Sequence, residues 1–195
     1  MKIKKIVDMC RREGVVRIYD GEGGTQWISN GYACYPLYDV PELSEGEFFT
    51  VFDFSAKQRD ETIFQRAALP ESMSFKDFDV TERECEKLSP SIPYGSRLLI
   101  PYKTVRGIKF LDSEYLEPLI GESGESQVFE RISKKGEAYF AVKVGMCLRA
   151  VVMPFNAVNR SFVDNIEKIY SLCRASLDKE DHQISAFEGE KENDD

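Results

Sequence analysis

The chain has 195 residues and a formal net charge of −8, with 42% hydrophobic and 12% aromatic residues. This composition is typical of a folded soluble protein, and the length suffices for one domain or two small ones. The negative charge excludes a protein that coats DNA through its overall field, but it leaves room for a locally basic face. No apolar run reaches the roughly 18–20 residues that span a bilayer, and no apolar segment follows the basic start. We therefore expect a cytoplasmic protein without a membrane partner.

Chemistry-bearing residues are sparse. The single histidine, His182, lies in a polar stretch near the end of the chain, which disfavours a catalytic base there. The five cysteines are widely spaced and form no CxxC pair: Cys10, Cys34, Cys85, Cys147 and Cys173. This spacing argues against a zinc site and favours buried thiols in a reducing compartment. The sequence therefore predicts a non-enzymatic protein with no catalytic residues, no metal and no cofactor.

Apolar residues at helical spacing predict a first helix over residues 2–13, which Gly14 ends. Its other face carries three basic residues, Lys4, Lys5 and Arg12. The plain interpretation of this face is contact with solvent. The alternative is a surface that faces DNA phosphates.

Three strands follow, over residues 15–19, 25–29 and 32–38, and form a meander. The glycine cluster of residues 20–24 lacks GxxxxGK[ST] and lies between strands, so it predicts a hairpin turn and no phosphate loop. A capping box at Ser44 begins a second helix, and residues 61–69 favour a strand. Residues 71–79 indicate an irregular connection, and a second capping box at Thr81 predicts a short helix over residues 81–88.

The proline-rich residues 89–93 mark the best boundary between two halves. Strands are predicted over residues 96–102 and 105–110, then a short helix over residues 112–120 that Pro118 interrupts. Residues 127–133 and 138–144 indicate a hairpin. The run 146–153 is nearly all apolar, which predicts a strand covered on both faces. Ser161 opens a last amphipathic helix, and from residue 176 the composition indicates a disordered acidic tail.

A rough internal repeat links the halves, because strand, glycine turn, strand and proline recur in the same order. The first copy contains Val16, Trp27 and Gly31, and the second contains Val128, Ala141 and Gly145. In the second copy, a short helix and a hairpin precede an apolar strand that ends on proline. This order resembles one repeat of the bacterial DNA sliding clamp, the beta subunit of DNA polymerase III. The residues that carry the resemblance are Tyr115, Leu116, Gly145, Leu148, Val151, Val152, Met153 and Pro154.

The resemblance implies an α+β fold of clamp-like repeats, each a helix backed on antiparallel strands. Residues 1–90 and 91–175 would be the two halves, and residues 176–195 the tail. It also implies a non-enzymatic protein associated with the DNA replication machinery or a mobile element. Family clamps contact DNA phosphates weakly from inner helices, so Lys4, Lys5 and Arg12 become the DNA-facing candidates. Family clamps have three domains per chain, whereas this chain is far shorter and has room for one clamp domain or two degenerate halves.

The acidic tail contains a second link to replication. Gln183, Ile184 and Phe187 resemble the short peptide by which replication and repair proteins dock into a sliding clamp. The protein could thus be an adaptor that binds a clamp through its tail. Replication proteins, DNA and self-association all stay open as partners.

The remaining polar signals are weaker. The carboxylate pairs Asp77/Asp79 and Glu82/Glu84 are interpreted as charged surface, and Trp27 as a core residue. A small enzyme or regulatory domain with an unrecognised pocket is the alternative to a clamp-like protein. A pocket that gathers carboxyl or tyrosine groups with shifted pKa values would favour that alternative.

Overall fold

The computed structural model describes residues 1–38, 40–121, 124–156 and 159–191, with side chains up to residue 179. Residues Met1–Phe155 form one compact unit, and Asn156–Asp195 form a second. No helix in the described ranges is long and apolar enough to cross a membrane. The predicted division at residue 90 concerns a repeat inside the first unit and stays a prediction.

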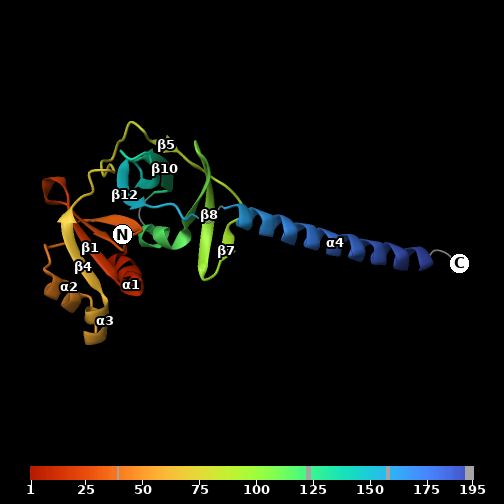
Figure 1. Ribbon diagram of the computed structural model, residues 1–195, viewed down its shortest axis with the longest axis horizontal. Helices are drawn as coiled ribbons and strands as arrows, with labels where there is room; N and C mark the ends of the chain where they lie inside the picture. The colour runs from red at the N-terminus through yellow and green to blue at the C-terminus, as the bar shows by residue number, and fades with distance from the viewer. Residues whose placement is uncertain (39, 122–123, 157–158, 192–195) are drawn as a thin grey trace. The chain divides into compact units, whose positions relative to one another are not determined.

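The first unit contains both helices and strands (Figure 1). Its helices are α1 (Ile3–Glu13), η1 (Glu22–Gly24), α2 (Glu45–Val51), α3 (Ala56–Glu61) and η2 (Ser113–Leu119). Its strands are β1 (Val15–Asp20), β2 (Gln26–Ser29), β3 (Ala33–Leu37), β4 (Ile63–Ala68), β5 (Arg83–Glu84), β6 (Glu86–Lys87), β7 (Ile92–Tyr94), β8 (Arg97–Thr104), β9 (Gly107–Asp112), β10 (Ser126–Ile132), β11 (Ala138–Val144) and β12 (Cys147–Val152). The second unit contains α4 (Arg160–Lys191).

The strands of the described residues form two sheets. The larger has eight strands in the order β4-β1-β2-β3-β12-β11-β10-β5, and β8 is the centre of the smaller one with β6, β7 and β9. All pairs are antiparallel except β1 with β4. The prediction of an α+β fold built on antiparallel sheets is confirmed.

The order of the large sheet is symmetrical about the contact of β3 with β12. A helical segment and a three-stranded meander occur on each side, α1 with β1-β2-β3 and η2 with β10-β11-β12. α1 contacts η2, and the Tyr35 hydroxyl on β3 donates a hydrogen bond of 2.9 Å to the backbone oxygen of Tyr115 on η2. The two segments that the sequence aligns, around Val16 and Val128, lie on the matching strands β1 and β10.

Both faces of the central strands are buried. Successive side chains of a strand point to opposite faces, so neighbouring residues belong to different apolar clusters. On one face, Ile28 and Val152 join the apolar stripe of α1 in the main core. On the other face, Trp27 and Val151 belong to a second cluster. The expectation that the last strand is covered on both faces is confirmed.

Two predicted elements are wrong. Residues 81–88 contain strands β5 and β6 instead of a short helix. The Thr81 hydroxyl donates to Asp79 and accepts from the backbone nitrogen of Ile132, so it caps no helix, and the chain after it pairs with β10.

The predicted tail also differs. α4 continues to Lys191 instead of ending near residue 175, since residues 176–191 contain no proline and many good helix formers. The side chain of Asn159 accepts from the backbone nitrogen of Phe162 near the start of α4, a role that the sequence assigned to Ser161. Residues 192–195 lie outside the described residues.

Candidate functional site

The three predicted DNA-facing residues lie on α1, next to the acidic helix η2. The Lys5 Nζ is 2.8 Å from a carboxylate oxygen of Glu117, and Arg12 pairs with Glu114. The hydrogen bond from Lys5 to Glu117 raises the pKa of the lysine. Lys4 is exposed. Helix η2 therefore neutralises two of the three cations, and the surface is mixed in charge instead of basic.

The three tail candidates, Gln183, Ile184 and Phe187, lie in the C-terminal part of α4. Their backbone is helical, but their side chains lie outside the described part of the structure. Their role in binding a clamp stays a prediction.

A different region gathers functional groups on the face of the large sheet opposite α1. The connection between β4 and β5 crosses this face, and Leu69, Met73 and Phe75 pack against the cluster that contains Trp27. The ring centroids of Trp27 and Phe75 are 5.1 Å apart in an edge-to-face arrangement. Aromatic pairs prefer this geometry, which fixes the connection on the sheet.

An open cleft of about 960 Å³ lies between this connection and the turn from β1 to β2; we call it the outer cleft. Apolar side chains form its floor: Trp27, Tyr38, Leu69, Met73, Phe75 and Leu148. Charged residues line its rim: Asp20, Glu22, Glu71, Lys76, Asp77 and Lys134. A cleft that combines apolar side chains with convergent polar groups is a common composition of a binding site.

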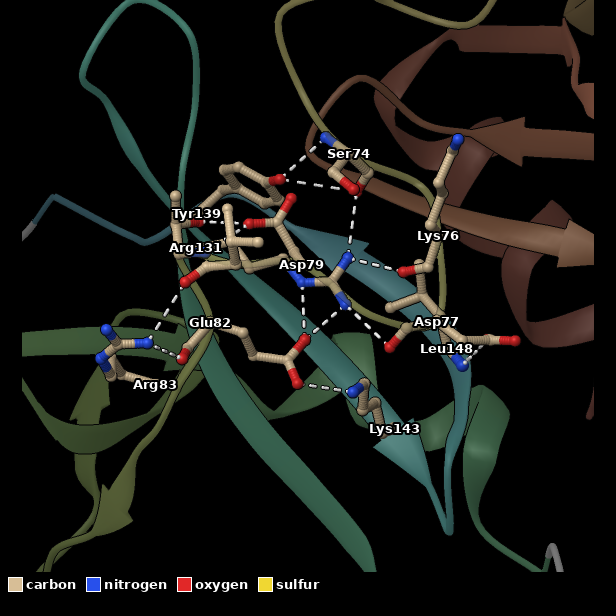
Figure 2. A network of polar contacts seen from close by, with 12 residues as sticks. Ser74, Lys76, Asp77, Asp79, Glu82, Arg83, Arg131, Tyr139, Lys143 and Leu148 are labelled. Carbon is tan, nitrogen blue, oxygen red and sulfur yellow. Dashed lines mark hydrogen bonds and ion pairs between the residues drawn. The ribbon is translucent and has the colours of Figure 1, made fainter.

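Arg131 on β10 holds one wall of the outer cleft in place (Figure 2). Its Nε and Nη2 donate to Oε2 of Glu82 at 2.8 and 2.5 Å. Its Nη1 donates to the backbone oxygens of Ser74 and Lys76, and Nη2 also donates to that of Asp77. A guanidinium has five N–H donors, so these contacts use all of them. Arg131 is 0% exposed and is therefore a structural anchor that does not reach a ligand.

Glu82 receives a second buried cation. The Lys143 Nζ lies 2.5 Å from Oε1 of Glu82 and 4.9 and 4.8 Å from the ring centroids of Phe78 and Phe129. Two cations thus contact Glu82, and two aromatic rings lie close to the Lys143 ammonium. These contacts compensate for the desolvation of Arg131, Lys143 and Glu82.

Neighbouring hydrogen bonds tighten the same wall. The backbone nitrogen of Leu148 donates to Asp77 at 2.7 Å, and that of Ser74 donates to the Tyr139 hydroxyl at 2.8 Å. Burial by itself raises the pKa of Asp79, but hydrogen bonds from the Thr81 hydroxyl and backbone outweigh it, and the pKa is lowered. The wall is therefore fixed before any ligand arrives.

One rim carboxylate, Asp20, has a lowered pKa. Arg66 lies 2.8 Å from Asp20, and this hydrogen bond lowers the pKa of the aspartate. Lys76 lies 3.7 Å from Glu22. A carboxylate of lowered pKa is a weak base, so Asp20 is suited to charge recognition more than to proton transfer. Among the described residues, no group of three or more His, Cys, Asp or Glu side chains is placed to hold a metal ion.

Several of these residues were missed or misinterpreted from the sequence. Glu82 was predicted to be charged surface, yet its side chain is 13% exposed and neutralised from within. Arg131 drew no prediction at all. The available signal was Lys143, which lies between the apolar residues Val142 and Val144 of β11; Arg131 follows Glu130 in β10 and gave no such signal. Trp27 is 5% exposed, as expected of a core residue, and it also lines the cleft.

Comparison of the chain with protein-family models, curated proteins and solved structures found no significant match.

Proposed function

We propose that this protein is a non-enzymatic, clamp-like binding protein that takes a short apolar segment of a partner protein into the outer cleft. The observation that carries the proposal is an apolar cleft whose wall is fixed by a fully satisfied buried arginine. A rigid site loses little entropy on binding, so even a short segment can bind with useful affinity.

Tyr38 supplies accessible surface for such a segment. It is 45% exposed, and the guanidinium of Arg149 lies 5.2 Å from its ring centroid. Covering about 100 Å² of apolar surface on Tyr38 and its neighbours contributes about 2.5 kcal/mol. One aromatic or aliphatic anchor of the partner is enough to cover this area.

The charge of the rim selects the flanks of that segment. Four carboxylates line the outer cleft against two lysines. Asp20 pairs with Arg66 and Glu22 with Lys76, and the two other carboxylates, Glu71 and Asp77, still outnumber Lys134. Basic residues beside the apolar anchor therefore favour binding, and acidic residues oppose it.

The partner that fits best is a protein of the DNA replication machinery. The support is the sequence resemblance to sliding clamps together with the symmetrical order of α1-β1-β2-β3 and η2-β10-β11-β12. The mixed charge where α1 meets η2 makes DNA a weaker candidate than protein. Capture of purified clamp that is lost on deletion of residues 183–187 would instead identify an adaptor that uses its tail.

A small enzyme is the main alternative. It requires a base or acid whose pKa is shifted toward neutrality. The shifted carboxylates at or beside the cleft, Asp20 and Asp79, have lowered pKa values, which does not favour this alternative.

Selection of short random peptides on the immobilised protein tests the proposal. Trp27 is the only tryptophan of the chain and lines the cleft, so its fluorescence reports directly on occupancy. Selected peptides should carry an apolar anchor with basic flanks and should change the Trp27 emission. Tyr38→Ala should weaken their binding about tenfold, or ~1.4 kcal/mol. Val105→Ala, at an exposed position outside the cleft lining, is the matched control. Selected peptides that bind Tyr38→Ala as tightly as wild type would contradict the proposal.

A further inference from the structure

Helix α4 carries an apolar stripe that is exposed in the structure. It is one continuous helix of 32 residues (Figure 1). Ile166 is 42% exposed, Tyr170 61% and Leu177 60%. Helices in water derive most of their stability from the packing of such a face, so a stripe of this length requires an occupant.

The spacing of the stripe is that of a coiled coil. Its members alternate at intervals of three and four residues: Val163, Ile166, Tyr170, Cys173 and Leu177. In the sequence the same alternation continues through Glu180, Ile184 and Phe187, of which only Glu180 is polar. This heptad pattern is the seam along which a second helix of similar pattern packs.

The charges of α4 identify a second copy of the helix as the occupant and set its direction. In residues 160–174, three basic residues outnumber two acidic ones: Arg160, Lys168 and Arg174 against Asp164 and Glu167. In residues 178–191, five acidic residues outnumber two basic ones: Asp178, Glu180, Asp181, Glu188 and Glu190 against Lys179 and Lys191. A parallel pair brings the two acidic segments together, whereas an antiparallel pair separates them and sets the start of the acidic segment of each copy beside residues 160–165 of the other.

Two residues at the edge of the seam fit the antiparallel arrangement in detail. Glu167 and Arg174 occupy the same heptad position one repeat apart. When two helices cross antiparallel with their centre between Tyr170 and Cys173, Glu167 of each copy lies beside Arg174 of the other. The interface is then self-complementary, as a two-fold dimer requires.

We propose that α4 forms an antiparallel two-helix coiled coil with α4 of a second copy of this chain, in which Ile166 of each copy faces Leu177 of the other. The full-length protein is then a homodimer, independent of what the outer cleft binds.

Sedimentation equilibrium of the full-length protein tests this proposal. We expect a dimer for the wild type and a dissociation constant at least about tenfold weaker for Leu177→Glu, which buries a charge in the seam. Ser171→Ala, at an exposed position outside the seam, is the control and should leave the dimer unchanged. A wild-type monomer at all concentrations would overturn the proposal.

Charge exchange tests the direction of the helices. Glu167→Arg and Arg174→Glu should each weaken the dimer, and the double variant should restore it. In a parallel pair these two positions do not face each other, so a dimer that ignores all three variants overturns the antiparallel arrangement.

Oxidation of a cysteine placed at position 177 provides an independent check. In a background of Cys147→Ser and Cys173→Ser, an in-register parallel dimer of the Leu177→Cys variant places the two new thiols opposite each other and forms a disulfide readily. In the antiparallel dimer these thiols lie on opposite sides of the centre, about 16 Å apart along the axis, and should resist this cross-link. Rapid and complete cross-linking at position 177 would therefore also overturn the proposal.

Discussion

Two clusters of ion pairs in this protein use the same chemistry at opposite degrees of burial. The side chains of Arg131 and Glu82 are 0% and 13% exposed, whereas those of Lys5 and Glu117 are 54% and 43% exposed. Water screens the exposed pair of Lys5 with Glu117, and it solvates either residue if the other is removed. Water does not reach the buried pair of Arg131 with Glu82 in this way. The buried cluster therefore shapes the outer cleft, and the exposed one only sets the charge where α1 meets η2.

Among the variants considered, removal of Arg131 should reduce the free energy of unfolding most. Arg131→Ala leaves Glu82 short of one cation and the backbone oxygens of Ser74, Lys76 and Asp77 without their donor. We expect a loss of about 3–5 kcal/mol in the free energy of unfolding, measured by urea denaturation. The matched variant on the exposed cluster, Arg12→Ala, should lose less than about 1 kcal/mol. Equal losses in the two variants would show that burial does not separate the clusters.

Acid should weaken the connection between β4 and β5 through Asp79. The folded protein lowers the pKa of Asp79 below its ordinary value of 3.8. A group of lowered pKa contributes stability above its unfolded pKa and loses it as the pH falls through the folded pKa. Urea midpoints should therefore decrease below about pH 4.

The variant Asp79→Asn identifies the source of this pH dependence. It should be less stable than wild type at pH 7 and should show a smaller decrease on acidification. An unchanged pH profile in this variant would assign the acid sensitivity to other carboxylates.

The smallest effect is expected from the exposed cluster. Glu114→Gln with Glu117→Gln should change the free energy of unfolding by no more than about 1 kcal/mol. The same double variant releases Lys5 and Arg12 from their partners, so it should bind duplex DNA more tightly than wild type, with a salt slope steeper by about 1.8. Fluorescence anisotropy of a labelled duplex measures both quantities.

The control for this experiment has the same net charge. Glu45→Gln with Glu125→Gln changes two exposed acids outside η2. If both double variants gain the same affinity for duplex DNA, the change in net charge explains the gain, and α1 is not a specific DNA-binding surface.

The sequence predicted the elements that depend on local patterns. The helical spacing of Ile6, Val7 and Cys10 identified α1, and alternation with a polar turn identified the hairpin of β10 and β11. The prediction failed at Thr81, where a capping-box pattern occurs in a segment that pairs as a strand. A local motif cannot reveal that a distant strand offers the same backbone a better partner.

The sequence by itself thus determined the α+β class, the positions of most strands along the chain and the apolar stripes. These features follow from the spacing of apolar side chains and from turn residues, which involve only residues close together in the chain. Only the tertiary structure decided the outer cleft. Its wall depends on Arg131 meeting Glu82, which lies 49 residues earlier in the chain, and Lys143 reaching the same carboxylate from 61 residues later. Which of many charged residues meet inside a protein depends on how the whole sheet closes, and no short stretch of the chain contains that information.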